Sequence, residues 1–311
     1  MKNSKHLIGV IFASLSIFLF TGKAFSQEKD NSEKHHNHHS GMKVEKKGDD
    51  SLLIHINKHE FGHLDFSGSP FACGKGKHKF NGHWAGVELG WNGYVNSDYN
   101  MIFPANQQYL NLNVARSMMV NLNLFDLNLN LIKYHFGFTT GLGFQFSNYF
   151  FNQNYKLMAD TTFLTAFRVY DDNGNAANLK INKLTVSWLN VPILFEYQTN
   201  SGIKMNSFHI AVGVIGGVRI GTYQKQTFDT WNTFYYLKDS YGKPVGSFYA
   251  GQEYIRTKNA FYLENFKLDA TARIGWSFLN FFATCSITPM FQDKKAPQVY
   301  PWTVGISLVG W

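Results

Sequence analysis

Apolar and polar residues alternate along most of the chain after residue 83. Over residues 84–92, Val87, Leu89 and Trp91 alternate with small or polar residues. Because successive side chains of a β-strand point to opposite faces, this period of two predicts a strand with one apolar face. The same pattern predicts further strands over residues 109–131, 136–150, 180–198, 207–223, 261–278, 281–291 and 301–311.

In two of these strands the apolar residues change face. In 109–131 the apolar positions shift by one residue at Phe125, which predicts a β-bulge or, alternatively, two strands joined by a turn. In 180–198 the shift occurs near Asn190. Pro192 predicts a break there, since proline cannot donate to a strand ladder. The residues expected to face outward on either side of the break are Leu184, Val186, Trp188, Ile193, Phe195 and Tyr197.

The connections between these strands alternate in length. The long ones cover residues 96–108, 151–179, 224–260 and 292–300, and the short ones cover 132–135, 199–206 and 279–280. Long outer loops and short periplasmic turns are typical of outer-membrane barrels, whereas a soluble sandwich does not need this alternation. We therefore expect an all-β fold: an eight-stranded antiparallel transmembrane β-barrel over residues 83–311, with both termini in the periplasm.

The N-terminal residues 1–26 have the pattern of a secretory signal peptide. Lys2 and Lys5 precede an apolar stretch over residues 7–20, and a small-x-small site ends at Ser26. The alternative is a transmembrane helix, but the apolar stretch is shorter than the ~20 residues that a helix needs to span a bilayer. No cysteine directly follows the stretch, so a lipid anchor is not expected. Export to the outer membrane of a Gram-negative cell is the expected localisation.

Composition favours the same class of protein. Aromatic residues make up 17% of the chain and charged residues 16%, whereas soluble domains carry roughly 25% charged residues. Removing the three lysines of the signal lowers the net charge from +8 to +5. This charge is spread along the chain, which favours solubility or attraction to anionic lipid over nucleic-acid binding. Two cysteines, Cys73 and Cys285, do not make a disulfide framework, and both are expected to be free.

Residues 27–82 form a histidine-rich segment that we expect to be mostly flexible and periplasmic, with one short ordered piece over 52–66. Its histidines suggest weak binding of Zn²⁺, Ni²⁺ or Cu²⁺ through neutral imidazoles, without a resident cofactor. The alternative is a solvated polar tract that binds no metal. The candidate ligands are His35, His36, His38, His39, His55, His59 and His63, the last three with a spacing that would align them on a helix.

The stretch from His59 to His63 matches the zinc-protease signature H-E-x-x-H and resembles its longer metzincin form. It departs from that form at Phe66, where the motif has glycine, and at Ser69, where it has the third histidine. Gly62 would also weaken the helix that the motif requires. The surrounding segment is too short for a protease domain, so no catalytic residue is assigned.

The strand parity also predicts which charged residues point into the barrel. An eight-stranded barrel is just wide enough to be filled by side chains, so buried charges inside it must pair. The alternative is a narrow, gated channel. His135 and His209 lie away from the outer rim, which argues against a hydrolase that works there. The residues expected to form ion pairs in the lumen are Glu88, Glu196, Arg219, Asp269 and Arg273.

Five motifs follow one another along the predicted strands. They are HWAGVELG at 83–90, FGFTTGLGF at 136–144, LNVPILFEY at 189–197, ARIG at 272–275 and YPWTVG at 300–305. In this order they resemble the PorT-like outer-membrane β-barrel family, often called the porin family. The resemblance covers residues 83–311 and implies an outer-membrane barrel. Most members have no assigned activity, and the namesake's part in protein secretion does not transfer with the fold.

The sequence thus predicts a non-enzymatic outer-membrane protein that is structural or binds a partner through its long loops. Aromatic residues crowd the loop over 224–260, where they would form a binding surface, extend the strands or build an interfacial girdle. The alternative function is a narrow channel or a component of protein export. Expected partners are outer-membrane lipid and lipopolysaccharide, an unknown extracellular or periplasmic molecule, and the barrel-assembly machinery. That machinery would read the terminal Trp311, although this residue is out of parity with the apolar positions before it.

Overall fold

The computed structural model describes residues 43–46, 52–55, 63–65, 80, 82–159, 162–199, 208–239, 241–276 and 279–309. All of them belong to the unit Gly41–Trp311. Within these residues no helix is long and apolar enough to cross a membrane. The expected signal peptide (1–26), the histidines 35, 36, 38, 39 and 59, Cys73 and the terminal Trp311 lie outside the described residues.

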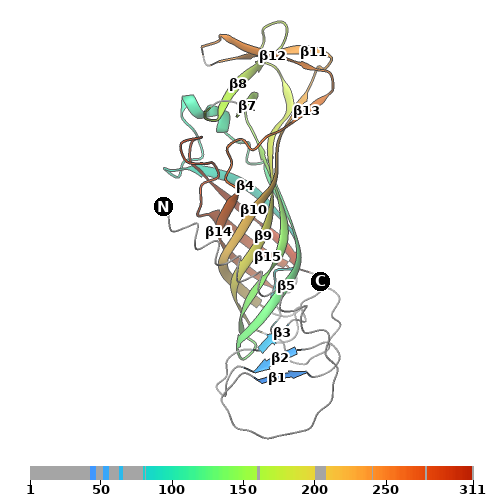
Figure 1. The fold of residues 1–311 in the computed structure, drawn as a ribbon, viewed down its shortest axis with the longest axis vertical. Helices are drawn as coiled ribbons and strands as arrows, with labels where there is room; N and C mark the ends of the chain where they lie inside the picture. Colours follow the sequence, from blue (N-terminus) through green and yellow to red (C-terminus); the bar gives the residue numbers. More distant parts are fainter. Residues whose placement is uncertain are drawn as a thin grey trace. The chain divides into compact units, whose positions relative to one another are not determined.

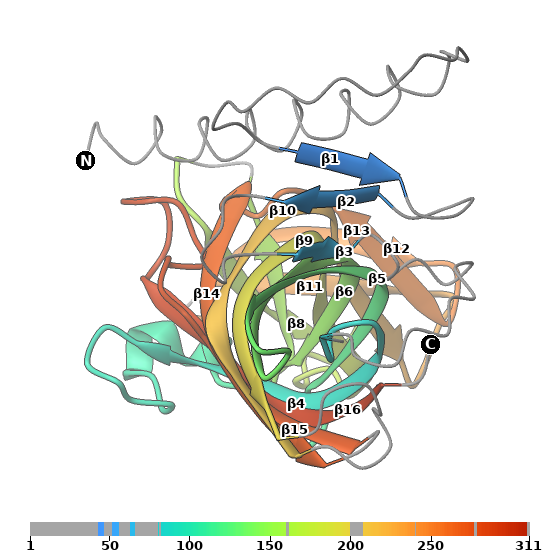
Figure 2. The same ribbon diagram turned by 90° about the horizontal axis from the view of Figure 1, so that it is seen from below.

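A large antiparallel sheet closes on itself. Its neighbours in order are β10, β14, β15, β16, β4, β5, β6 and β9, and the pairing of β9 with β10 completes the ring (Figures 1 and 2). The all-β fold and the antiparallel ring expected from the sequence are therefore confirmed. The strands are β4 (Gly86–Asn96), β5 (Met118–Ile132), β6 (Phe136–Phe150), β9 (Leu179–Gln198), β10 (Phe208–Phe228), β14 (Phe266–Trp276), β15 (Leu279–Ser286) and β16 (Val299–Val309).

The side chains of the ring alternate between its interior and its outer face. On β14, Leu268 and Ile274 are exposed while Asp269 and Arg273 are buried. On β6, Gln145 and the other odd-numbered residues are buried. These positions follow the expected parity, because the outer face carries almost only apolar residues there.

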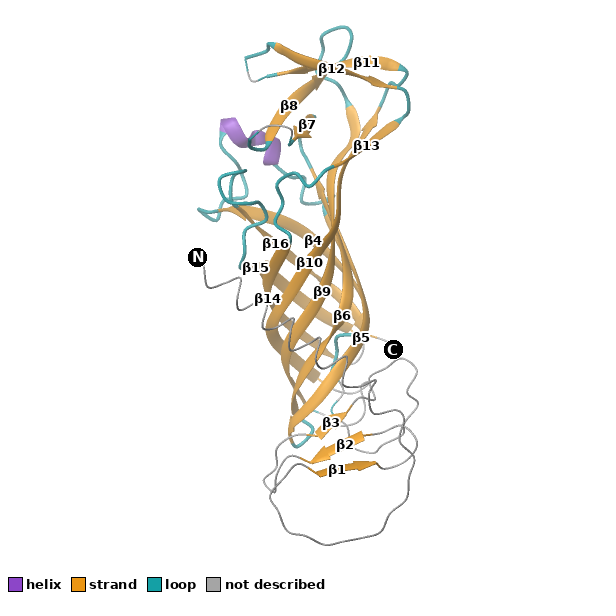
Figure 3. Ribbon diagram, in the orientation of Figure 1, coloured by secondary structure: helices purple, strands orange, loops and turns teal. Residues whose placement is uncertain are grey.

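The strand expected over 109–131 begins later, at Met118. Residues before it form a short 3-10 helix, η1 (Ala105–Leu110), which Figure 3 shows as the helical part of a long loop. Leu110 is buried, and its carbonyl accepts a hydrogen bond from the Tyr94 hydroxyl at 2.6 Å. The predicted β-bulge is confirmed, since the register between β5 and β6 shifts between Asn123 and Phe125. The alternative of two strands joined by a turn is wrong.

The predicted change of face on β9 is wrong. From Asn182 to Gln198 every even-numbered residue is buried, so Leu184, Val186 and Trp188 point inward rather than outward. The inward residues of β9 are mostly apolar near its start and partly polar near its end. In the sequence, this change looks like a shift of the apolar residues from one face to the other. Pro192 lies inside the continuous strand, and the pairing of β6 with β9 skips it.

The predicted long loops carry strands of their own. β7 (Tyr155–Met158), β8 (Thr165–Tyr170), β11 (Thr233–Lys238) and β12 (Pro244–Ala250) form a four-stranded sheet, and β13 (Tyr254–Lys258) adds to β10 (Figure 1). The loop aromatics thus partly extend the strands. Three short strands precede the ring: β1 (Lys43–Lys46) pairs with β2 (Leu52–His55), and β3 (His63–Asp65) pairs with β5.

Candidate functional site

The interior of the ring holds the main concentration of buried polar groups, and the chain enters it just before β4. This inner segment consists of Phe80 and residues 82–85. Phe80 lies against Gly137, where an added Cβ atom would come within 2.5 Å of its ring. Trp84 is fully buried and lies against Gly141 in the same way. Both glycines are inward positions of β6, so the missing side chains make room for the inner segment.

His83 of the inner segment is held by a carboxylate of the ring wall. Its backbone N–H donates to Glu196 Oε2 at 3.1 Å, and its Nδ1 is hydrogen-bonded to Glu196 Oε1. The imidazole of His209 stacks on that of His83 with ring centroids 3.6 Å apart. His209 also bonds the Asn280 side chain. Residues from three strands and the inner segment therefore meet in one buried cluster.

A second cluster joins Arg273 and Glu88. Arg273 Nη1 lies 2.5 Å from Glu88 Oε1, and Asn121 donates to the other carboxylate oxygen at 2.6 Å. The guanidinium also lies over the Trp84 ring, 4.7 Å from its centroid. Arg273 and Glu88 are 3% and 0% exposed, so this pair is shielded from water and ties the ring wall to the inner segment.

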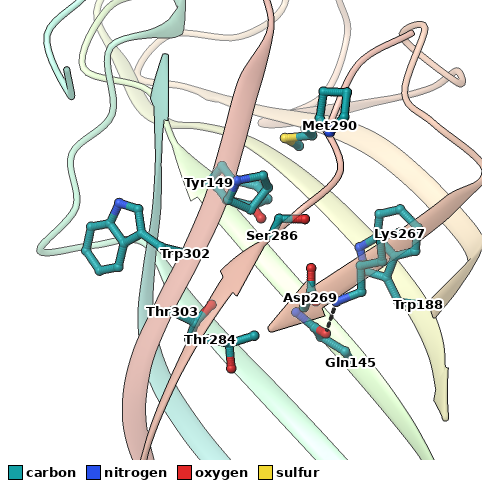
Figure 4. A pocket seen from close by; sticks show the side chains of 12 residues that line it. Gln145, Tyr149, Trp188, Lys267, Asp269, Thr284, Ser286, Met290, Trp302 and Thr303 are labelled. Atoms are coloured by element: carbon teal, nitrogen blue, oxygen red, sulfur yellow. Dashed lines mark hydrogen bonds and ion pairs between the residues drawn. The ribbon is translucent and has the colours of Figure 1, made fainter. Parts of the chain in front are cut away.

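A third cluster lies toward the long loops. Lys267 pairs with Asp269 and donates to Gln145 Oε1 at 2.7 Å (Figure 4). Asn190 donates to the same amide oxygen at 2.7 Å. The cavity beside them has a volume of about 20 Å³, which is enough for a single water but not for a substrate.

Beyond this cluster the interior becomes apolar. We call this layer the apolar cap. All four long connections between ring strands contribute to it, one of them through η1, and the side chains of the ring wall complete it. Its buried members are Tyr94, Phe103, Leu110, Tyr149, Leu157, Leu164, Leu184, Val186, Trp188, Phe261, Leu263, Met290, Phe291 and Val299.

The structure therefore brings four of the five expected lumen residues into buried contacts, and it places Arg219 elsewhere. The Arg219 guanidinium is only part-buried and donates to the carbonyl oxygen of Glu264 at 3.1 Å and to Asn265 Oδ1 at 2.7 Å. The register between β10 and β9 shifts just after it. Arg219 thus hydrogen-bonds the connection that precedes β14, and it forms no interior ion pair with the described residues.

The partners of these charges were not singled out by the sequence. Lys267 and His209 share the inward parity of their strands, which was a usable signal. His83 and Trp84 precede β4, so no alternation of polar and apolar residues indicates which way their side chains point. Asp126 is buried beyond the bulge on β5, where the parity had changed.

The expected metal ligands are not brought together by any described contact. His55 ends β2 and His63 begins β3, so the backbone is extended at both and not helical, as their spacing had suggested. Among the described residues no group of three or more His, Cys, Asp or Glu side chains is placed to hold a metal ion. Cys285 is free and exposed on the outer face of β15.

Comparison with known proteins gives no match: no family model fits the chain, and no characterised protein or solved structure is significantly similar to it.

Proposed function

We propose that the ring is an eight-stranded transmembrane β-barrel of the outer membrane, with its short turns and both termini in the periplasm. The apolar belt on its outer face is the observation that carries this proposal. On β14 every outward position is apolar, and neighbouring strands continue the belt. Soluble monomers rarely expose apolar patches larger than a few hundred Å². The outward residues of β14 are Phe266, Leu268, Ala270, Ala272, Ile274 and Trp276.

The height of the belt suits a bilayer. On β10 it runs from Phe208 to Ile220, both exposed. Twelve steps of about 3.3 Å at a strand tilt of about 40° correspond to a height of about 30 Å, against roughly 25 Å for the apolar band of outer-membrane barrels. Aromatic residues gather at the edge near the short turns, where Phe208 pairs with Trp276 and Phe136 with Tyr197. This arrangement supports an interfacial girdle.

We further propose that the barrel does not catalyse a reaction, and that it acts as a structural protein or binds a partner through its loop sheet. The inner segment, the buried ion pairs and the apolar cap fill the interior, which supports a closed lumen. On the basis of the five sequence motifs, we propose that the chain belongs to the PorT-like family. Its proposed partners are the barrel-assembly machinery and outer-membrane lipid.

Cell fractionation and heat-modifiability test the barrel proposal. The full chain should fractionate with outer membranes, and its unheated form should migrate differently on gels from the boiled form. A soluble periplasmic protein without heat-modifiability would refute the proposal.

A narrow channel is the second candidate function. Several buried polar atoms inside the ring, including Asn280 Nδ2 and Ser307 Oγ, have no hydrogen-bond partner among the described residues, and water would satisfy them. Planar-bilayer recordings separate the two candidates. A closed barrel gives no steady conductance, whereas stable single-channel steps would favour the channel.

A further inference from the structure

Three cations face one another across β9, β10 and β13, on the outer face of the sheet. Lys183 of β9 pairs with Lys225 of β10, and Lys225 pairs with Arg256 of β13. A fourth cation, Lys258, lies two residues after Arg256 on β13. It pairs with Tyr223 of β10 and is exposed. We call these four cations the basic row.

No carboxylate in the described part of the chain pairs with the basic row. Nearby Lys180, by contrast, lies 3.7 Å from Asp229. Like charges directly opposite one another destabilise a sheet. Burial lowers the pKa of Lys183, as do the positive charges of Lys225 and Arg256, against an opposing effect of Tyr223. An anion bound to the row would relieve this repulsion.

Aromatic rings support the cations from the side. Lys225 Nζ lies 4.8 Å from the centroid of Tyr254, and Arg256 Cζ lies 5.4 Å from the same ring. Lys183 Nζ lies 5.2 Å from the centroid of Phe150. These contacts hold the charged groups in place, and the ammonium and guanidinium groups keep further N–H donors for a ligand.

The row stands just beyond the apolar belt. Lys225 lies five residues after Ile220, the last exposed apolar residue of the belt on β10, which corresponds to about 12 Å of height at the usual rise and tilt. The Lys183 side chain leans back toward the belt, because its Nζ donates to Asn148 Oδ1 at 2.8 Å. Asn148 pairs with Thr185, which lies two residues closer to the belt than Lys183. In the proposed orientation the row reaches the headgroup layer of the outer leaflet.

We propose that the basic row binds the phosphate groups of an outer-leaflet glycolipid, with Arg256 as the bidentate donor and the lysines as point charges. This inference rests on the proposed membrane location. Guanidinium and ammonium groups at lipid headgroup depth suit phosphate, and the aromatic contacts fix their positions. The bound phosphate thus supplies a negative charge that no described carboxylate supplies to the row.

The test compares full-length protein in nanodiscs that contain lipid A, dephosphorylated lipid A or phosphatidylglycerol, with bound lipid counted by native mass spectrometry. We expect preferential retention of lipid A by the wild type. The variant Lys225→Gln/Arg256→Gln should lose about tenfold in apparent affinity, and high salt should reduce the difference. The matched control Lys133→Gln/Lys243→Gln removes two exposed lysines outside the row and should behave as wild type.

A second readout does not depend on lipid. Without lipid A, the Lys225→Gln/Arg256→Gln variant should unfold at a slightly higher denaturant concentration than wild type, because a repulsion is removed. Equal lipid A binding by wild type and this variant would overturn the site. Equal retention of phosphatidylglycerol, or saturable binding of inorganic phosphate at low millimolar concentration, would overturn the glycolipid assignment. Wild type that fails to insert into any bilayer would overturn the barrel proposal as well as the site.

Discussion

Replacing Arg273 with methionine should destabilise the protein strongly, because it leaves Glu88 as an unpaired buried charge. In the wild type the two side chains are 2.5 Å apart, and among the described residues the carboxylate otherwise accepts a hydrogen bond only from Asn121. Breaking a buried pair by removing one partner costs about 3–5 kcal/mol. The Trp84 ring also loses the guanidinium that lies over it, which adds a cation–π contribution of up to about 2 kcal/mol.

A double-mutant cycle separates this cost from general damage to the core. Replacing the pair with neutral residues, Glu88→Gln/Arg273→Met, should recover most of the loss, because exchanging a buried pair for neutral groups is often close to neutral. Urea unfolding of the refolded protein in detergent or liposomes, followed by tryptophan fluorescence, gives the four free energies of unfolding. The matched control Arg256→Met lies on the exposed outer face and should change stability by less than about 0.5 kcal/mol. A loss below about 1 kcal/mol for Arg273→Met, without coupling to Glu88, would show that the carboxylate is solvated and would refute the filled interior.

Three further outcomes follow from the interior and the C-terminus. Gly141→Val should destabilise the fold by more than 2 kcal/mol in the same urea assay, since its Cβ would lie 2.2 Å from the Phe125 carbonyl oxygen and 2.8 Å from Trp84; wild-type stability would contradict the position of the inner segment. Trp84→Ala should cost about 3–5 kcal/mol and produce transient current bursts in planar bilayers, and a silent variant of unchanged stability would count against the inner segment as a plug. A polar tail added after Trp311 should reduce the heat-modifiable fraction in cell membranes, while unaltered assembly would argue against a terminal recognition signal.

Much of the ring could be predicted from the sequence because its outward positions are mostly apolar. On β6 and β14 this pattern fixed the parity, and the shift at Phe125 located the bulge. The same reasoning failed on β9, where Trp188 and its neighbours face an apolar cap built by distant loops. Apolar residues identify the outer face only where the interior is polar. The sequence of β9 alone does not show where the polar part of the interior ends.

The interior site was predictable only in part, for a related reason. Parity placed Glu88 and Arg273 on the inner face, but it could not pair them, because pairing depends on the order of strands around the ring. His83 lies outside any strand, so its contact with Glu196 depends on how the chain enters the ring. Arg219 has inward parity, yet it binds the connection before β14 because the ladder shifts beside it.

Cys285 offers the most direct test of the central claim that the outer face of the ring contacts lipid. It is a free thiol, exposed on β15 beside apolar outward residues. A nitroxide attached to Cys285 in a Cys73→Ser variant reports its surroundings by power-saturation electron paramagnetic resonance in liposomes. A lipid-facing label collides readily with dissolved oxygen and rarely with a water-soluble nickel complex, and this is the predicted result. Ready collision with the nickel complex and little with oxygen would contradict the account.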